Sequence, residues 1–193
     1  MTETKHQTTT LPNGLKIVTE RFDNVRSIAL SIMVGTGSRN EQLDQAGLSH
    51  FLEHLLFKGT DKYTSSEIDE YFDSIGAEVN ASTNKEVTTV YARFLDRHLE
   101  GAFDHIAEMV MKSTFEDIDA ERQVVIEEIA MYEDEPSDIV FDLLGRRVFG
   151  DTPLGRRIIG TEDVVGGVSV ERIAAYRDEQ YVPGNLVIAA AGA

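Results

Sequence analysis

Apolar and polar residues recur along the chain with the spacings of both strands and helices. Segments with the two-residue alternation or short apolar run of a strand are 8–11, 16–19, 27–34, 77–83, 86–94 and 185–191. Pro12-Asn13-Gly14 lies between the first two segments and predicts a hairpin, because Asn-Gly tolerates the positive φ of a tight turn. Asn84-Lys85 separates the fourth and fifth segments and predicts a second hairpin.

Other segments repeat apolar residues every three or four positions, as helices do. Predicted helices cover residues 48–57, 99–112, 119–131, 138–149 and 170–179, with another that begins near Thr64 and ends at Gly76. Pro136 is expected to end the helix before it, and a glycine-rich loop is expected before residue 170. Strands and helices do not alternate regularly. We therefore predict one α+β domain over residues 1–193, with two layers: a mainly antiparallel sheet and helices packed on one face.

The composition is that of an ordinary folded protein, with 193 residues of which 41% are hydrophobic and 27% charged. The net charge of −16 at pH 7 argues against a nucleic-acid partner, because phosphate binding requires a basic surface. The same charge favours cationic substrates by electrostatic steering. The absence of cysteine excludes disulfides, thiolate metal ligands and cysteine nucleophiles.

No apolar stretch is long enough to cross a bilayer, which takes about 20 residues in a helix. Residues 1–6 lack the apolar core of a secretory signal. We therefore expect a protein without a membrane span, located in the cytoplasm, whose reducing conditions also suit a chain without cysteine.

The strongest chemical signal is the pentapeptide His50-Phe51-Leu52-Glu53-His54. Helix residues four apart lie about 40° apart around the axis, so His50 and His54 can reach one metal ion. Glu53 flanks the same face and can stand beside a metal-bound water without being a ligand. A histidine pair alone is usually incidental, but a glutamate in this position is the signature of an inverted zincin.

A catalytic zinc site needs a third protein ligand, and without cysteine we expect a carboxylate from another segment. The best source is the predicted helix 119–131, in which Glu121 and Glu128 are seven residues apart and share one face. Glu127 points about 100° away from Glu128 and is expected to be solvated. Taken alone, the pair is explained better as a solvated helix face than as a ligand source.

The pentapeptide, with the following Leu55-Leu56-Phe57-Lys58-Gly59-Thr60, closely resembles the inverted-zincin peptidases of the pitrilysin family. That family includes the insulin-degrading enzymes and the β subunits of the mitochondrial processing peptidase. The resemblance covers nearly the whole chain. Its further blocks occur in the family's order at residues 76–81, 121–128, 153–155, 159–161 and 181–185.

The resemblance implies a processing-peptidase-like metallohydrolase fold and a zinc-dependent endopeptidase that hydrolyses extended peptides through a metal-activated water. It makes His50, His54 and Glu128 the ligands of one Zn²⁺ and Glu53 the general base. Glu121 corresponds to a glutamate that supports catalysis from behind the ligands by orienting the site.

Residues 79–82 correspond to the family's edge strand, which pairs with the substrate backbone, so the resemblance makes Asn80 and Ala81 substrate contacts. Such pairing reads the backbone rather than side chains, and broad specificity would follow. An acidic run adds the hypothesis that basic peptides are favoured: Glu127, Glu128, Glu133, Asp134, Glu135 and Asp138. A solvated helix end explains this run equally well.

Members of this family consist of tandem homologous domains, or of two such chains, around a chamber, and this chain resembles the metal-bearing domain only. The companion half supplies an arginine and a tyrosine for substrate binding, and no segment here matches them. We therefore expect a homologous companion domain or subunit as a partner, and weak activity of this domain by itself.

Three other interpretations are open. A noncatalytic peptide-binding or partner subunit would typically have lost one of the histidines or glutamates, and all are present here. A peptide-binding module with a structural zinc would use four protein ligands, usually rich in cysteine. An S-ribosylhomocysteine lyase shares the inverted motif but uses cysteine, which this chain lacks.

Overall fold

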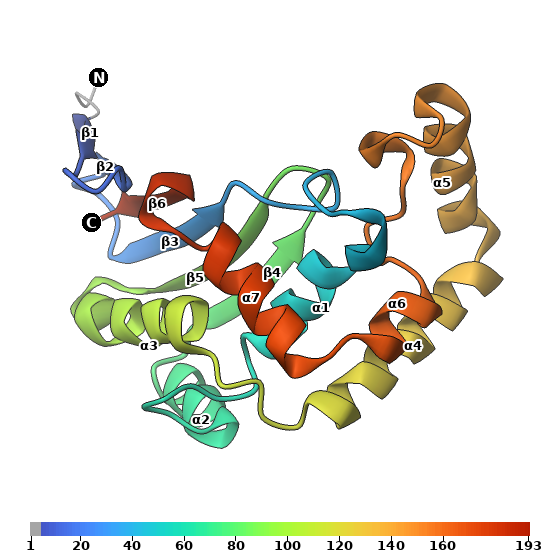
Figure 1. Cartoon of the computed structure of the whole chain (residues 1–193). Helices are drawn as coiled ribbons and strands as arrows, with labels where there is room; N and C mark the ends of the chain where they lie inside the picture. Colours follow the sequence, from blue (N-terminus) through green and yellow to red (C-terminus); the bar gives the residue numbers. More distant parts are fainter. Residues whose placement is uncertain (1–4) are drawn as a thin grey trace.

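The computed structural model describes residues 5–193, which form a six-stranded sheet with helices packed against it (Figure 1). The strand order is β1-β2-β6-β3-β5-β4. The strands are β1 (Lys5–Thr10), β2 (Lys16–Arg21), β3 (Ser27–Val34), β4 (Glu78–Thr83), β5 (Thr88–Leu95) and β6 (Leu186–Gly192). Residues 1–4, which belong to the segment expected to lack a secretory signal, lie outside the described residues.

Alternation in the central strands sends every second side chain into the core. In β3, Ile28, Leu30, Ile32 and Val34 are buried, and the residues between them are exposed or half-buried. Strand β5 alternates in the same way. One buried and one open face are typical of an antiparallel sheet covered by helices on one side. The predicted α+β class with a mainly antiparallel sheet is confirmed.

The helices enclose α1, which is the helix that carries the histidine pair. They are α1 (Leu48–Leu55), α2 (Ser65–Ser74), α3 (Leu99–Lys112), α4 (Ile118–Asp134), α5 (Pro136–Phe149), α6 (Glu162–Gly167) and α7 (Val170–Gln180). Helices α1 and α3 contact the sheet, and α4 and α7 contact α1. Helix α1 is therefore a core helix, with its position fixed from several sides.

The last strand of the sequence lies in the middle of the sheet. Strand β6 pairs in parallel with β2 and antiparallel with β3, so that Ile188 lies beside both Ile17 and Ile32. The apolar pattern of residues 185–191 predicted this strand, but its neighbours are set by long-range packing that local pattern does not encode. The parallel pair is the one exception to antiparallel pairing in the described sheet.

Two local expectations differ from the structure. The segment expected to be only a glycine-rich loop contains the short helix α6, which the buried side chain of Val165 anchors. Adjacent Gly166 and Gly167 lower its helix propensity, so tertiary packing decides its conformation. Pro136 follows α4 and is also the first residue of α5. The N–H group at this position takes part in no helical hydrogen bond, so proline is tolerated there.

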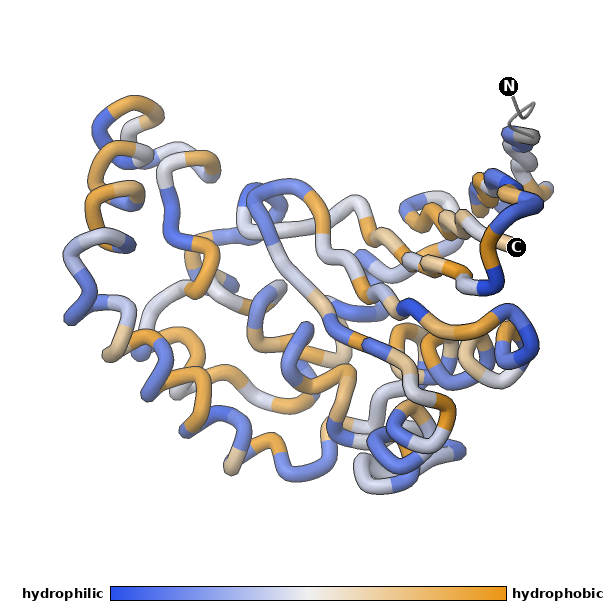
Figure 2. The backbone as a smooth tube through the Cα atoms, turned by 180° about the vertical axis from the view of Figure 1, so that it is seen from behind, coloured by the Kyte–Doolittle hydropathy of each residue, from blue (hydrophilic) through white to orange (hydrophobic). Residues whose placement is uncertain are grey.

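Helix α5 lies at the end of the molecule farthest from β1, and none of its residues is buried (Figure 1). Figure 2 shows hydrophobic stretches along this helix. The large apolar side chains that α5 exposes are Val140, Phe141, Leu143, Leu144, Val148 and Phe149. An apolar surface this extensive is typical of a site of interaction.

A close contact between two glycines fixes the start of α1. Gly47, immediately before the helix, has φ +100° and Gly160 has φ +79°. A Cβ atom on Gly160 would lie 2.3 Å from the carbonyl oxygen of Ala46, and one on Gly47 would lie 2.8 Å from that of Ile159. The two backbone segments therefore pack directly against each other, which only glycine permits at both positions.

We predict that Gly160→Ala lowers the free energy of unfolding by more than about 1 kcal/mol, because it adds a backbone clash to an unfavourable φ. The control is Gly145→Ala in the middle of α5, where a new Cβ meets nothing within 4 Å. That change should raise the free energy of unfolding by roughly 0.5–1 kcal/mol through helix propensity. Urea denaturation measures both values, and equal effects would contradict the predicted contact.

Candidate metal centre

The face of α1 that the core does not cover carries three of the expected site residues. The apolar residues of α1 recur at helical spacing and are fully buried: Leu48, Phe51, Leu52 and Leu55. His50, Glu53 and His54 lie between them and are half-buried. The same periodicity that packs the helix therefore places both imidazoles on one accessible face.

Helix α4 brings Glu128 to the two imidazoles. The Nε2 atoms of His50 and His54 are 3.3 Å apart. Glu128 Oε1 lies 3.7 Å from His50 Nε2, and Glu128 Oε2 lies 3.4 Å from His54 Nε2. Among the residues that the structure describes, these three form a group able to hold a metal ion.

The spacing of the two imidazole nitrogens fits a tetrahedral ion. Ligand atoms at zinc's usual distance of about 2.0–2.1 Å lie about 3.3–3.4 Å from one another in a tetrahedron. The separation of the two Nε2 atoms agrees with this value, and each imidazole has a different oxygen of Glu128 within 3.7 Å. Two imidazoles and one carboxylate are also the donor types that zinc accepts in catalytic sites.

Glu121 orients the ring of His54 from behind. The His54 Nδ1 atom lies 2.9 Å from Glu121 Oε1, and because a carboxylate only accepts, Nδ1 carries the hydrogen. In the neutral ring this leaves a lone pair on Nε2, directed towards His50 and Glu128. Lys58 Nζ lies 2.7 Å from the other oxygen of Glu121. Carboxylate–histidine pairs of this kind are the usual support of metal-binding histidines.

The neighbours of Glu121 and Glu128 keep both carboxylates charged. Burial alone would raise the pKa of Glu121, but the hydrogen bonds from Lys58 and His54 outweigh it and lower the pKa. The hydrogen bond with His54 lowers the pKa of Glu128. Both groups therefore face the imidazoles as anions at neutral pH.

Glu53 is in a different environment from the other two glutamates. Burial raises its pKa, a hydrogen bond with the Thr83 hydroxyl partly offsets this, and the nearby charge of Glu128 raises it further. Its Oε2 atom is buried and has no hydrogen-bond partner among the described residues. A buried carboxyl group with a raised pKa and an unused oxygen has the properties of a general base.

The two histidines differ in their protonation. Burial, together with the neighbouring His54, lowers the pKa of His50 to about 4, so this ring is neutral at neutral pH. Burial would also lower the pKa of His54, but Glu128 and Glu121 outweigh burial and raise it above its ordinary value of 6.5. Below this raised pKa, a metal ion that binds His54 displaces a proton.

Strand β4 is the edge of the sheet next to α1. Asn80 is exposed on this strand and Ala81 is buried. The Ala81 N–H donates to the Asn80 side-chain oxygen at 2.8 Å, so a peptide pairing with this N–H would have to displace the side chain. Thr83, at the end of the same strand, links the edge to Glu53.

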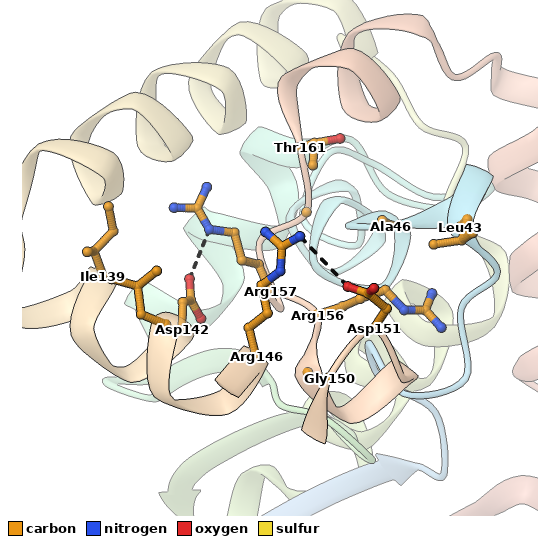
Figure 3. Close-up of a pocket in the computed structure, with 13 residues that line it drawn as sticks. Leu43, Ala46, Ile139, Asp142, Arg146, Gly150, Asp151, Arg156, Arg157 and Thr161 are labelled. Carbon is orange, nitrogen blue, oxygen red and sulfur yellow. Dashed lines mark ion pairs between the residues drawn. The ribbon is translucent and has the colours of Figure 1, made fainter. Parts of the chain in front are cut away.

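A cavity of about 710 Å³ lies away from the histidine pair, between α5, the loop before α1 and residues 150–161 (Figure 3). None of the expected site residues lines it. Its arginines are largely paired: Arg157 with Asp142 and Glu133, and Arg146 with Asp151. Because its charged groups are paired and the expected site residues lie elsewhere, we do not take this cavity as the catalytic site.

The structure brings together the residues that the sequence singled out. His50, His54 and Glu128 converge, Glu121 supports His54, and Glu127 is exposed as expected. Sequence reasoning missed Lys58, which lies three residues past the end of α1, where helical spacing gives no signal.

The fold and the donor set define a domain of the metallopeptidase type. Residues 16–162 match the family described as insulinase (peptidase family M16), and the chain belongs to this family.

Named relatives agree with this membership. The chain is 45% identical over 185 residues to the uncharacterized zinc protease YmxG of Bacillus subtilis, covering 95% of this chain and 45% of that protein. It is 38% identical over 187 residues to the probable β subunit of the mitochondrial processing peptidase of Arabidopsis thaliana, covering 96% of this chain and 35% of that protein. The chain thus spans less than half the length of these curated relatives.

Solved structures show the same fold. A protease from Helicobacter pylori superimposes with a TM-score of 0.92 at 27% identity, over 98% of this chain and 46% of that chain. A peptidase M16 inactive domain from Pseudomonas fluorescens superimposes with a TM-score of 0.90 at 20% identity, over 97% of this chain and 46% of that chain. The second likeness concerns the fold alone. No helix in the described part of this chain is long and apolar enough to cross a membrane.

We predict that three glutamate substitutions weaken Zn²⁺ binding to different degrees, with Glu128→Ala the most harmful and Glu127→Ala without effect. Chelator competition measures the affinity. Glu121→Gln should weaken binding by roughly 10–100-fold, the usual effect of losing a group that supports a ligand. Glu128→Ala should weaken it more, because a donor atom is lost. Glu127→Ala, one residue away and exposed, is the matched control and should bind as the wild type does. Unchanged affinity in Glu128→Ala would assign the third ligand elsewhere.

We also predict that Zn²⁺ affinity rises with pH. The raised pKa of His54 means that one proton competes with the ion below that pKa, whereas His50, with a pKa of about 4, and Glu128, with a lowered pKa, do not compete near neutrality. Affinity should rise by up to about tenfold per pH unit below the His54 pKa and level off above it. Chelator competition at pH 6, 7 and 8 measures this, and affinity that does not vary would exclude proton displacement.

Proposed function

We propose that this chain is the metal-bearing domain of a zinc-dependent endopeptidase. The observation that carries the proposal is the convergence of His50, His54 and Glu128 on one point, beside the half-buried carboxyl group of Glu53. Relatives named as zinc proteases support both the ion and the reaction.

The side chains divide the work of peptide hydrolysis. When bound, a zinc ion supplies Lewis acidity, which polarises a carbonyl group and lowers the pKa of water to about 7. Glu53 takes the proton from the attacking water and later gives it to the leaving amine. The raised pKa of Glu53 makes its carboxylate a stronger base than an ordinary glutamate, which favours the first of these transfers. Glu121 and Lys58 hold His54 in the tautomer that leaves Nε2 free.

Strand β4 is the proposed site of substrate binding. An extended peptide would add to this edge of the sheet, with Asn80 and Ala81 as backbone contacts and Thr83 leading towards Glu53. Backbone pairing of this kind accepts many sequences. The net charge of −16 supports a preference for basic peptides through steering.

A homologous companion domain or subunit is the proposed partner. The chain covers only 45% of the Bacillus relative and 46% of the Helicobacter structure, so more than half of each has no counterpart here. The exposed apolar side chains of α5 are a suitable surface for such a companion, because they would otherwise remain in water.

The alternative of a noncatalytic partner subunit fits the structure less well. Loss of any one of His50, Glu53, His54 or Glu128 would disable the site, and all four are present in one arrangement. A protein that only bound peptides would have no use for a buried carboxylate oxygen without a hydrogen-bond partner beside the donor atoms.

We predict that Glu53→Gln retains zinc and loses peptide cleavage by roughly 10²–10⁴-fold, because the amide has the same shape but cannot accept the proton. Zinc content and hydrolysis of an unstructured peptide are measured for the chain alone and with a companion half added. His54→Ala is the control and should lose both zinc and cleavage. If Glu53→Gln loses zinc instead, Glu53 is a ligand and the assignment of the base is wrong.

A further inference from the structure

Helix α1 has no capping side chain at its own N-terminus. Gly47 occupies the N-cap position, and the residues that usually cap helices cannot replace it. A Cβ atom there would lie 2.8 Å from the carbonyl oxygen of Ile159, and the φ of +100° disfavours any side chain. The free N–H groups of the first turn must therefore find acceptors outside the helix.

Glu41 provides these acceptors from the preceding loop. Its Oε2 accepts a hydrogen bond from the Gly47 N–H at 2.9 Å, and its Oε1 accepts one from the Ser49 N–H at 2.7 Å. The residue is 2% exposed. A carboxylate at the positive end of a helix dipole is favourable, and its bonds to N–H groups are strong because they are charge-assisted.

The loop that carries Glu41 is itself held in place. Arg156 Nη1 donates to the backbone oxygen of Glu41 at 2.8 Å, and Arg156 belongs to the wall of the cavity in Figure 3. Burial of a carboxylate is unfavourable unless its oxygens are hydrogen-bonded, and here both are. The side chain and the backbone of Glu41 are therefore both held by hydrogen bonds.

The two metal-binding histidines are oriented by different means. The ring of His54 is held directly by Glu121. The Nδ1 atom of His50 is buried and has no hydrogen-bond partner in the described part of the chain. His50 is the third residue of α1 and lies in the turn that Glu41 holds. The Nδ1 side of the His50 ring therefore has no support like that of Glu121, and the backbone of this turn contributes to the place of His50.

We propose that Glu41 is a positioning residue for the metal centre: by binding the Gly47 and Ser49 amides, it fixes the first turn of α1 and with it the Nε2 atom of His50. This inference rests on the proposed function, because it takes His50 as a ligand. Glu41 acts on His50 through the backbone, as Glu121 acts on His54 through the ring.

The test is Glu41→Gln, which keeps the side-chain length and one acceptor oxygen but removes the charge and the second acceptor. Zn²⁺ affinity should fall about tenfold or more, as for other groups that support ligands. The visible spectrum of the Co²⁺-substituted protein should change as well, since it reports the geometry of the donors. Ile106→Val, in the buried face of α3, is the control for mild destabilisation and should change neither.

A folded Glu41→Gln variant with wild-type Zn²⁺ affinity and Co²⁺ spectrum would overturn the inference. Failure of the wild type to bind Zn²⁺ would overturn the proposed function instead, so the two failures are distinguishable. Neither measurement depends on peptide cleavage.

A second measurement uses the wild type and does not require the variant to fold. By linkage, if the cap favours metal binding, then bound Zn²⁺ must strengthen the cap. Hydrogen exchange at the Gly47 and Ser49 amides should slow on adding Zn²⁺, by a larger factor than at the Ile106 amide in α3. Equal slowing at all three amides, or none at Gly47 and Ser49, would contradict a specific role of Glu41.

Discussion

The packing of α1 between the sheet and α4 is the constraint on which the metal centre depends. Phe51, Leu52 and Leu55 are fully buried in this layer, and the Arg122 guanidinium of α4 lies 5.3 Å from the centre of the Phe51 ring. Because interiors are close-packed, these side chains set the distance between the two helices. That distance decides whether Glu128 of α4 reaches the imidazoles of α1, which it does at 3.4 and 3.7 Å.

Both ends of α1 are held by residues far away in the chain or outside the helix. Glu41 binds the amides at its start, and the Ser113 hydroxyl donates to the carbonyl oxygen of Leu55 at its end, at 2.8 Å. A helix of eight residues has little intrinsic stability in water. Tertiary contacts at its ends and sides therefore supply the rigidity that a preorganised metal centre requires.

Periodicity explains which parts of this arrangement could be predicted from the sequence. The four-residue spacing of His50 and His54 and the seven-residue spacing of Glu121 and Glu128 are local helical properties, so the sequence predicted both sets of neighbours. The meeting of α1 with α4 is a long-range event: the need for a third ligand pointed to helix 119–131 as the carboxylate source, and the family resemblance then assigned Glu128 within it. The central position of β6 and the cap by Glu41 also depend on tertiary packing, and no local pattern predicts either.

The glutamates around α1 show why residue type alone does not assign a role. Burial and the charge of Glu128 raise the pKa of Glu53, whereas the hydrogen bond with His54 lowers the pKa of Glu128. Where the pKa values of neighbouring carboxyl groups are shifted in opposite directions, the group with the higher pKa suits proton transfer. The group that stays charged suits the binding of a cation. The environments of the two residues therefore support, alongside the sequence motif, the proposed roles of Glu53 as the base and Glu128 as the ligand.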